Sequence, residues 1–458
     1  MLAMVGASPA RGESTKKPNV LLLSIDDLND WTGCLGGHPQ ARTPNIDRLA
    51  ERGTLLSNAH CQAPVCNPSR ASLLTGRHPH FSGVYFLGPD LKQAPSLRDL
   101  DTLPERFARH GYRALAAGKI FHTGDKRFFD EYGGNMGGFG PRPKKKISQP
   151  HGHPLWDWGA FPERDDQMPD LKIADWAVRK LKSIPANPDQ PFFMGVGFYR
   201  PHTPYVAPLH HARHYPLDKI EPVLELPGDR DDIPPAALPD RPNQRELTIE
   251  QRKEIIRAYY ASTTLMDACL GRVLDGLKKL KLDDDTIVVF LSDHGYHLGQ
   301  HGLWQKSDLF EGSARVPFII SVPGMKTAGQ SSSSLTELID LYPTLADLCN
   351  LPQPKHLKGH SLAPLLANPK ATVRQAAYST TRIRPRLPGF TGKVKPLGRS
   401  IRTDRYRYTE WADGKYGVEL YDYQTDPGEI TNLARSAAHT DKVKQLKTIF
   451  DQTRKHTR

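Results

Sequence analysis

The stretch VLLLSIDD, Val20 to Asp27, joins a short apolar run to two adjacent carboxylates. A second apolar run, Thr286 to Ser292, is followed directly by Asp293 and His294. Such runs alternate along the chain with helical patterns, which is typical of a parallel or mixed sheet covered on both faces. In open α/β sheets, ligands bind at the carboxyl ends of strands. The sequence therefore predicts a polar site where these two strands end.

Three further runs extend the predicted sheet, at 113–117, 192–198 and 318–322. The clearest helix is Arg252 to Leu280, where apolar residues recur at helical spacing. A shorter helix is predicted after Thr43, its expected N-cap, and ends at Gly53. The chain is thus predicted to be an α/β protein with a large sheet covered by helices on both faces.

Beyond the predicted core, the pattern of the sequence changes in two ways. Two Pro-rich stretches, 138–162 and 222–242, have no period and are expected to be long surface loops. After Lys370, strand-like runs at 406–410 and 418–423 precede a final helix, which predicts a small C-terminal α+β subdomain. We expect a catalytic domain at 17–370 and a C-terminal subdomain at 371–458.

Length and composition limit the classes of function. The 458 residues are enough to bury a core without disulfides, and the five cysteines show no metal-type CxxC pair. The net charge of +12 favours polyanions, but no nucleic-acid-binding motif is visible, so no nucleic-acid partner is expected. No apolar run approaches the ~20 residues of a membrane span. Residues 1–16 resemble the end of a secretory signal or a disordered tail, and we expect a periplasmic or secreted protein.

The acidic strand ends are candidates for a metal site. Adjacent carboxylates repel one another unless a cation neutralises them, so Asp26, Asp27, Asp293 and His294 are explained by a shared metal. Oxygen ligands favour Ca²⁺ or Mg²⁺, while the histidine would also suit Zn²⁺ or Mn²⁺. The alternative is that these are ordinary turn residues.

The stretch CNPSRASLLTGR, Cys66 to Arg77, carries the second candidate feature. Pro68 is suited to the start of a helix, which puts Cys66 at or just before its N-cap. Amides at a helix N-terminus favour an anion and lower a thiol pKa. A thiolate nucleophile usually needs a His or Asn partner, whereas the neighbours here are Arg70 and Arg77, which suit oxyanions.

This stretch resembles the motif of cysteine-type, formylglycine-dependent type I sulfatases, C-x-P-S-R followed by L-x-T-G-R. The resemblance covers most of the chain and includes TPNIDRLAERGTLLSNAHCQAPVCNPSR, LTELIDLYPTLADL and ELYDYQTDPGEITNLA. The segments AGKIFHTG, GFYRPHTPY and SDHGYHLGQHGLWQK are most similar to the iduronate-2-sulfatase branch and its bacterial relatives.

The resemblance implies an alkaline-phosphatase-like sandwich and an enzyme that removes sulfate from a sulfated sugar of a polysaccharide or oligosaccharide. Cys66 would be converted to Cα-formylglycine by a separate formylglycine-generating or anaerobic sulfatase-maturing enzyme. In the family, one hydroxyl of the aldehyde hydrate attacks sulfur, the alcohol leaves, and the second hydroxyl expels sulfate. The family metal is calcium, with Mg²⁺ less favoured here.

The resemblance also implies a role for individual residues. The metal ligands would be Asp26, Asp27, Asp293, His294 and the hydrate oxygen of residue 66 (Cys66). Arg70 would hold the formylglycine, Lys119 would contact a sulfate oxygen and His122 the hydrate hydroxyl. His202 and Lys306 would face the bridging ester oxygen, where one of them protonates or stabilises the leaving group.

Two other functions compete with this hypothesis. A phosphatase or phosphonate monoester hydrolase of the same superfamily would bind a similar anion, and a phosphatase would need a second metal with more ligands. A non-catalytic binder of sulfated polysaccharide would leave Cys66 unmodified. Tyr296 and Trp304, close to the metal motif, are either sugar-stacking platforms or packing residues.

Overall fold

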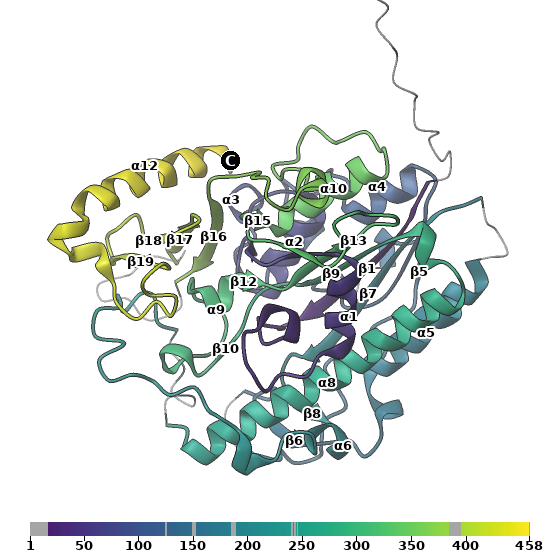
Figure 1. Cartoon of the computed structure of the whole chain (residues 1–458), viewed down its shortest axis with the longest axis horizontal. Helices are drawn as coiled ribbons and strands as arrows, with labels where there is room; N and C mark the ends of the chain where they lie inside the picture. The colour runs from purple at the N-terminus through teal and green to yellow at the C-terminus, as the bar shows by residue number, and fades with distance from the viewer. Residues whose placement is uncertain are drawn as a thin grey trace, which may run out of the picture.

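The computed structural model describes residues 17–123, 126–148, 153–184, 189–239, 241, 244, 246–383 and 395–457. Its centre is an eight-stranded sheet between two layers of helices, with a smaller sheet and a long terminal helix at one side (Figure 1). The sheet order is β14 (Gln330–Ser332), β2 (Thr54–Leu56), β13 (Phe318–Ser321), β9 (Thr286–Ser292), β1 (Asn19–Asp26), β7 (Phe192–Pro201), β4 (Arg113–Gly118) and β5 (Glu131–Tyr132).

The middle of this sheet is parallel, and one side of it is mixed. β1 runs parallel to both β7 and β9, with Leu22 opposite Gly195 on one side and Val289 on the other. β13 is antiparallel to both β9 and β2. The predicted mixed α/β sheet is therefore confirmed, and the five strands expected from the sequence all lie in it.

The apolar runs reflect burial on both faces of the sheet. Val20 and Leu22 pack with α2 (Cys66–Thr75), α4 (Leu103–Arg109) and α10 (Leu341–Leu348), whereas Leu21 and Leu23 pack with α1 (Pro44–Arg52), α5 (Pro169–Ser183) and α8 (Ile249–Lys279). All four side chains are fully buried. Each contributes about 1.5–3 kcal/mol by leaving water, which fixes β1 at the centre.

The start of one helix and the capping contact of another differ in detail from the sequence prediction. α8 begins three residues before Arg252, at a capping box in which the Thr248 hydroxyl accepts from the amide of Gln251 at 3.2 Å. Thr43 precedes α1 as predicted, but its hydroxyl accepts from the Gly33 amide and does not cap the helix. The buried carboxylate of Asp267 on α8 accepts from the first amides of α1 instead, a tertiary contact that no local pattern indicates.

Shorter elements connect these layers. They are β3 (Ala59–His60), β12 (Arg315–Val316) and β15 (Thr336–Glu337) in one small sheet, β10 (His297–Leu298) with β11 (Trp304–Gln305), β6 (Trp158–Ala160) with β8 (Tyr205–Ala207), and the helices α3 (Pro79–Ser82), α6 (Leu209–Ala212), α9 (Glu311–Ala314) and α11 (Ala363–Ala367). Apart from β6, the described parts of the two Pro-rich stretches are irregular, as predicted.

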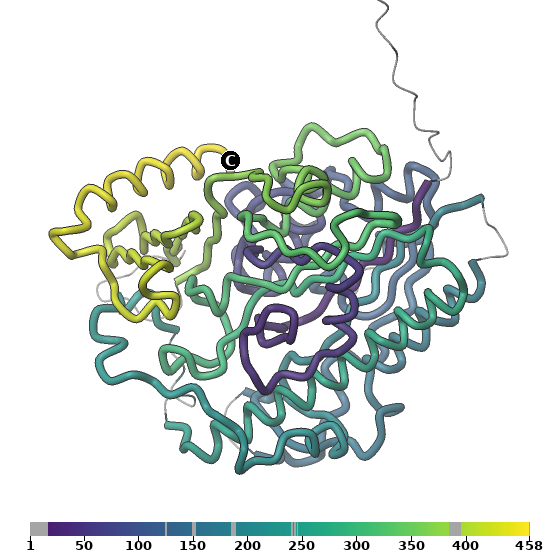
Figure 2. Tube along the Cα trace, in the orientation of Figure 1, coloured from purple at the N-terminus to yellow at the C-terminus, as the bar shows by residue number. Residues whose placement is uncertain are grey.

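The C-terminal part forms a separate antiparallel sheet of β16 (Ala377–Arg382), β17 (Leu397–Arg402), β18 (Tyr406–Trp411) and β19 (Val418–Asp422). α12 (Thr440–His456), yellow in Figures 1 and 2, packs on it through Leu446 and Phe450. Arg407 of this sheet, 1% exposed, pairs with Glu429 at 2.8 Å and with Glu311 of α9, which ties the sheet to the main body. The boundary at residue 370 stays a prediction.

No helix among the described residues is both long and apolar enough to cross a membrane. The predicted leader remnant at 1–16 lies outside the described residues, so the expectation of export is not tested.

Candidate active site

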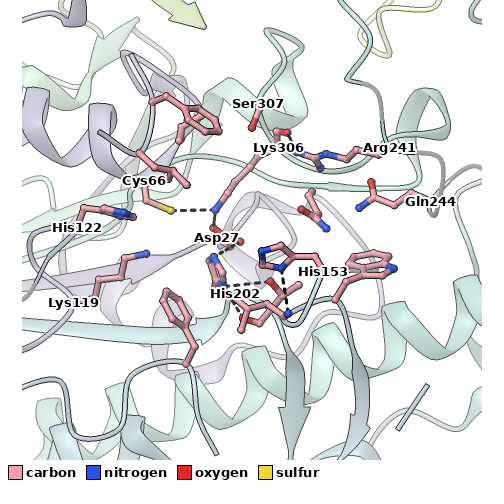
Figure 3. Close-up of a pocket in the computed structure, with 18 residues that line it drawn as sticks. Asp27, Cys66, Lys119, His122, His153, His202, Arg241, Gln244, Lys306 and Ser307 are labelled. Atoms are coloured by element: carbon pink, nitrogen blue, oxygen red, sulfur yellow. Dashed lines mark hydrogen bonds and ion pairs between the residues drawn. The ribbon is translucent and has the colours of Figure 1, made fainter. Parts of the chain in front are cut away.

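The carboxyl ends of four neighbouring strands meet beside one cavity of about 540 Å³; Asp27, Lys119 and His202 line it, whereas Asp293 does not line it but clusters with Cys66 (Figure 3). β1 ends at Asp26 and is followed by Asp27, and Lys119, His202 and Asp293 follow β4, β7 and β9. Because these strands are parallel neighbours, residues more than 260 positions apart in sequence converge there.

Cys66 reaches the same cavity from α2. It is the first residue of the helix, with Val65 as the N-cap, so it lies one position further along than predicted. The difference arises because Pro68 occupies the third helical position, where its missing N–H has no helical acceptor in any case. The first helical hydrogen bond joins the Ser69 amide to the Val65 carbonyl at 3.1 Å. The amide of Asn67 in the first turn therefore has no helical partner, as expected for a helix N-terminus that favours an anion.

The predicted metal ligands form one cluster. Ligand atoms of Asp26, Cys66, Asp293 and His294 all lie within 4.8 Å of one another, and so do those of Asp26, Asp27, Cys66 and His202. The two groups share members, so they describe a single constellation. Asp27 has a left-handed backbone, φ 64°, which is rare for a residue other than glycine and directs the chain sharply at the end of β1.

The donor set fits a divalent cation. The His294 Nδ1 lies 2.9 Å from the Gly295 carbonyl and must donate to it, so Nε2 is the ring atom that a metal would take as a ligand. That Nε2 lies 3.4 Å from the Cys66 Sγ, from the Asp27 Oδ1 and from the Asp293 Oδ1. Three carboxylates, each 0–1% exposed, and one oriented imidazole suit an oxygen-preferring cation such as Ca²⁺.

Arg70 contacts two carboxylates of this cluster on its buried side. Its Nε donates to the Asp293 Oδ2 at 2.9 Å, and its Nη2 lies 3.8 Å from the Asp26 Oδ1. Nη1 donates to the Ser24 hydroxyl at 3.2 Å and to the Ile120 carbonyl at 3.1 Å. The side chain is 1% exposed, so it acts as a fixed buried cation among the carboxylates.

Lys119 is positioned by two glycines. Gly118 has φ 79°, and a Cβ built on it would lie 1.9 Å from the Gly197 carbonyl oxygen, so only glycine lets β4 and β7 approach there. The Lys119 Nζ lies 2.5 Å from the Asp26 Oδ2. Burial lowers the pKa of Lys119, but the negative charges of Asp26 and Cys66 raise it by more, so the net shift of this pKa is upward. Lys119 is therefore a cation at neutral pH.

Lys306 approaches from the opposite side, on the turn that follows β11. Its Nζ donates to the Cys66 Sγ at 3.1 Å and pairs with Asp27 (Figure 3). Gln305 and Ser307 both have positive φ, and Arg241 donates to the carbonyls of Trp304 and Lys306 at 2.5 and 2.6 Å. Arg241 thus braces the strained turn that carries the lysine.

The two predicted histidines also line the cavity. The His202 Nδ1 lies 2.7 Å from the Thr203 carbonyl and donates to it, which leaves Nε2 facing the Asp27 Oδ2 at 3.7 Å. His122 is among the groups that lower the pKa of the Cys66 thiol, and its buried Nδ1 has no hydrogen-bond partner among the described residues. Each ring therefore offers one nitrogen to the cavity.

The environment of Cys66 strongly favours an anion. Burial raises the pKa of its thiol, but Lys119, Lys306 and His294 outweigh burial and hold the pKa well below the ordinary value. The other four cysteines are free and are not part of this cluster, and burial raises the pKa of Cys34 to about 11. The same positive field would stabilise any oxyanion at residue 66.

Sequence reasoning missed the opposite wall of the cavity. His153, Trp156 and Arg241 line it and come from the two Pro-rich stretches, whose irregular backbone gives no period to detect, and Gln244 lies just after the second stretch. Figure 3 shows Arg241 and Gln244 at the end of the cavity away from His122 and Lys119.

Tyr296 and Trp304, considered as sugar platforms, are packing residues. They are 1% and 2% exposed, belong to a buried aromatic cluster and do not line the cavity.

Comparison with known proteins identifies relatives over nearly the whole chain. The model of the family described as Sulfatase matches residues 18–351, and that of N-sulphoglucosamine sulphohydrolase, C-terminal, matches 299–456. A sulfatase of Formosa agariphila is 34% identical, over 95% of this chain and 87% of its own. Iduronate 2-sulfatase of Mus musculus is 29% identical, over 94% of both chains.

Solved structures show the same architecture. A 2-O GAG sulfatase has a TM-score of 0.73 at 27% identity, over 96% of this chain and 93% of that chain. The phosphonate monoester hydrolase of Silicibacter pomeroyi has a TM-score of 0.80 at 24% identity, over 96% of both chains. The alkaline-phosphatase-like fold is confirmed by these likenesses.

Proposed function

Because this chain belongs to the sulfatase family and is a sulfuric ester hydrolase, we propose that it removes an O-sulfate from an anionic sugar, preferably a 2-O-sulfated uronic acid. We further propose that Cys66 acts as formylglycine beside one Ca²⁺. The observation that carries this proposal is the convergence of Lys119, His122 and Lys306 on Cys66 in one cavity.

The cations of the cavity would bind the sulfate group. Lys119 and Lys306 lie on opposite sides of Cys66 and are both protonated at neutral pH, so they can hold two of the sulfate oxygens by charge-assisted hydrogen bonds. Arg70 is buried beneath the cluster and has no access to substrate. Its role would be to fix Asp293 and to balance the carboxylates.

The two histidines would move protons at different atoms. His122 lines the cavity with residue 66 and would accept the proton of the hydroxyl group there. His202 has its tautomer fixed by the Thr203 carbonyl, and its Nε2 would face the ester oxygen when protonated. It would donate to the leaving alcohol, with Lys306 stabilising the developing charge.

The two absent groups would supply complementary chemistry. Formylglycine supplies a hydrated aldehyde, whose second hydroxyl offers a built-in route to sulfate release, and Ca²⁺ held by Asp26, Asp27, Asp293 and His294 stabilises negative charge at residue 66. The chain's own residues would position both groups, and the burial of Asp26, Asp293 and His294 would keep the inner side of the site dry.

The far wall of the cavity supports an anionic saccharide as substrate. About 540 Å³ is within the range of small-molecule sites and leaves room beyond the sulfate for a sugar ring. Arg241, Gln244 and His153 at that end could contact a carboxylate and hydroxyl groups, and Trp156 offers an apolar edge. The name of the murine relative, iduronate 2-sulfatase, is consistent with such a substrate.

Mass spectrometry of the tryptic peptide Gly53 to Arg70 tests the nucleophile directly. We expect an aldehyde at residue 66 in protein matured in its native host, through a maturing enzyme. An intact thiol in an active preparation would overturn the formylglycine mechanism, and an intact thiol in inactive protein would favour the binder hypothesis.

Release of sulfate from a panel of defined saccharides tests the substrate. We expect 2-O-sulfated uronic acid residues to react faster than 6-O-sulfated sugars or sulfated sugars that lack a carboxylate. The phosphonate monoester hydrolase is a structural neighbour, so phosphonate and phosphate monoesters belong in the panel. Preferential turnover of those esters would replace the proposed function.

A further inference from the structure

A second metal-type cluster lies outside the cavity. Among the described residues, one further group brings ligand atoms within 4.8 Å of one another, and it consists of Asp165, His210 and His211. Asp165 precedes α5, in a short 3-10 turn at Asp165–Gln167, and the two histidines are in α6. α6 packs against α8 and follows β8, at the lower edge of Figure 1.

The geometry of this cluster matches a metal site. The His211 Nε2 lies 3.0 Å from the Asp165 Oδ1, and the His210 Nε2 lies 3.3 Å from the Asp165 Oδ2. In tetrahedral zinc sites with bonds of about 2.0–2.2 Å, neighbouring ligand atoms lie roughly 3.3 Å apart. Consecutive helical residues project about 100° apart, yet both Nε2 atoms converge on one carboxylate, with ring centroids 4.1 Å apart.

The cluster is buried on one side and open on the other. The His211 side chain is 7% exposed, so its ring is held in place beside Asp165. Asp165 and His210 are 34% and 54% exposed, so the open side of the cluster is accessible to water.

We propose that Asp165, His210 and His211 bind one Zn²⁺ ion, with solvent completing the coordination. Two nitrogen donors and one carboxylate suit zinc better than calcium, which prefers oxygen ligands. The ion would fasten α6 to the turn before α5. This second metal differs from the cation proposed for the cavity and does not depend on the enzymatic activity.

Titration of the whole protein with Zn²⁺ tests the site. The protein is stripped with a chelator and then saturated with Ca²⁺, so that the cavity ligands are occupied before zinc is added. We expect one equivalent of Zn²⁺ by calorimetry, a Co²⁺ absorption spectrum typical of tetrahedral sites, and a thermal midpoint raised by roughly 2–5 °C at saturating zinc.

Three variants decide the assignment. His210→Ala changes an exposed side chain and should remove the zinc equivalent and the cobalt spectrum without affecting the fold or sulfate release. Asp165→Asn should weaken binding more than the roughly 10–100-fold expected for an outer-shell change. His456→Ala is the matched control, because it removes an exposed histidine stacked on His360, 6.3 Å away, and should retain binding. Equal zinc binding by wild type and His210→Ala, or its loss in His456→Ala, would overturn the proposal.

Discussion

Replacing Arg70 by Met is expected to destabilise the metal-free protein by about 3–5 kcal/mol, the usual effect of removing one partner of a buried ion pair. The Arg70–Asp293 pair is 2.9 Å long, and its side chains are 1% and 0% exposed. The change would leave the Asp293 carboxylate uncompensated in a site that also holds Asp26. We expect the midpoint of thermal unfolding to fall by roughly 3–5 °C.

The stability lost in Arg70→Met should depend on pH and on calcium. Burial already raises the pKa of Asp293, Arg70 lowers it, and the change removes that lowering effect. A carboxyl group whose folded pKa exceeds its unfolded value destabilises the fold only where it is ionised, so the loss should be smaller at pH 5 than at pH 8. Saturating Ca²⁺ should also reduce the loss, because a bound cation would compensate the same carboxylate.

Thermal unfolding with chelator and with Ca²⁺, at both pH values, measures these effects. Arg77→Met is the matched control, since Arg77 follows the same helix and donates to the His356 carbonyl at 2.7 Å. The Arg77→Met variant should lose about 1 kcal/mol of unfolding free energy, and this loss should be independent of calcium. A loss under about 1 kcal/mol for Arg70→Met in chelator, or one unaffected by calcium, would refute the idea that Arg70 balances the metal-site carboxylates.

Four further predictions follow from the geometry of the cavity. Cys66→Ala should abolish sulfate release, measured by ion chromatography, while circular dichroism stays unchanged, because Leu73 and Leu74 provide the packing of α2; unchanged release would refute the nucleophile. His202→Ala should lower kcat about 10²–10⁴-fold for alkyl sulfates but much less for aryl sulfates, whose leaving groups need no proton; equal losses would exclude a general acid role. In unconverted protein, the alkylation rate of Cys66, followed by mass spectrometry, should vary little between pH 6 and 8, because the depressed pKa keeps the thiol ionised. The alkylation rate of Cys34 should rise about tenfold per pH unit, because its pKa is about 11. An equally steep rise for Cys66 would contradict the cationic environment of residue 66. Removal of divalent cations with a chelator should abolish turnover, and Ca²⁺ should restore it better than Mg²⁺; full activity in chelator would contradict a required metal.

The main layers of the fold could be predicted from the sequence. β1 and β9 are buried on both faces, so most of their residues are apolar, and α8 repeats its apolar residues at helical spacing over many turns. The start of α8 was placed three residues late, although its capping box at Thr248 is local, whereas the start of α1 was placed correctly but its capping partner was not found. Asp267, more than 200 residues away, caps α1, and no window around Thr43 contains that information.

The candidate site was also partly predictable. The acidic strand ends and the Cys66 motif are local, and motif resemblance added Lys119, His122, His202 and Lys306, all of which line the cavity with Cys66. The far wall was not predictable, since Arg241 and His153 lie on irregular loops whose side chains follow no period. The aromatic residues near the metal motif were ambiguous for the same reason, and burial settles Tyr296 and Trp304 as packing residues.

The sequence by itself determined which chemistry is available: an alternating α/β pattern, carboxylates at strand ends, and a cysteine at a helix start between arginines. Only the tertiary structure decided which groups meet, because distances between residues far apart in the chain depend on strand order and packing. The turn that brings Lys306 to 3.1 Å from the Cys66 Sγ is braced by Arg241 from another loop. Asp165 and His211, 46 residues apart in the chain, likewise become neighbours only through the packing of their elements.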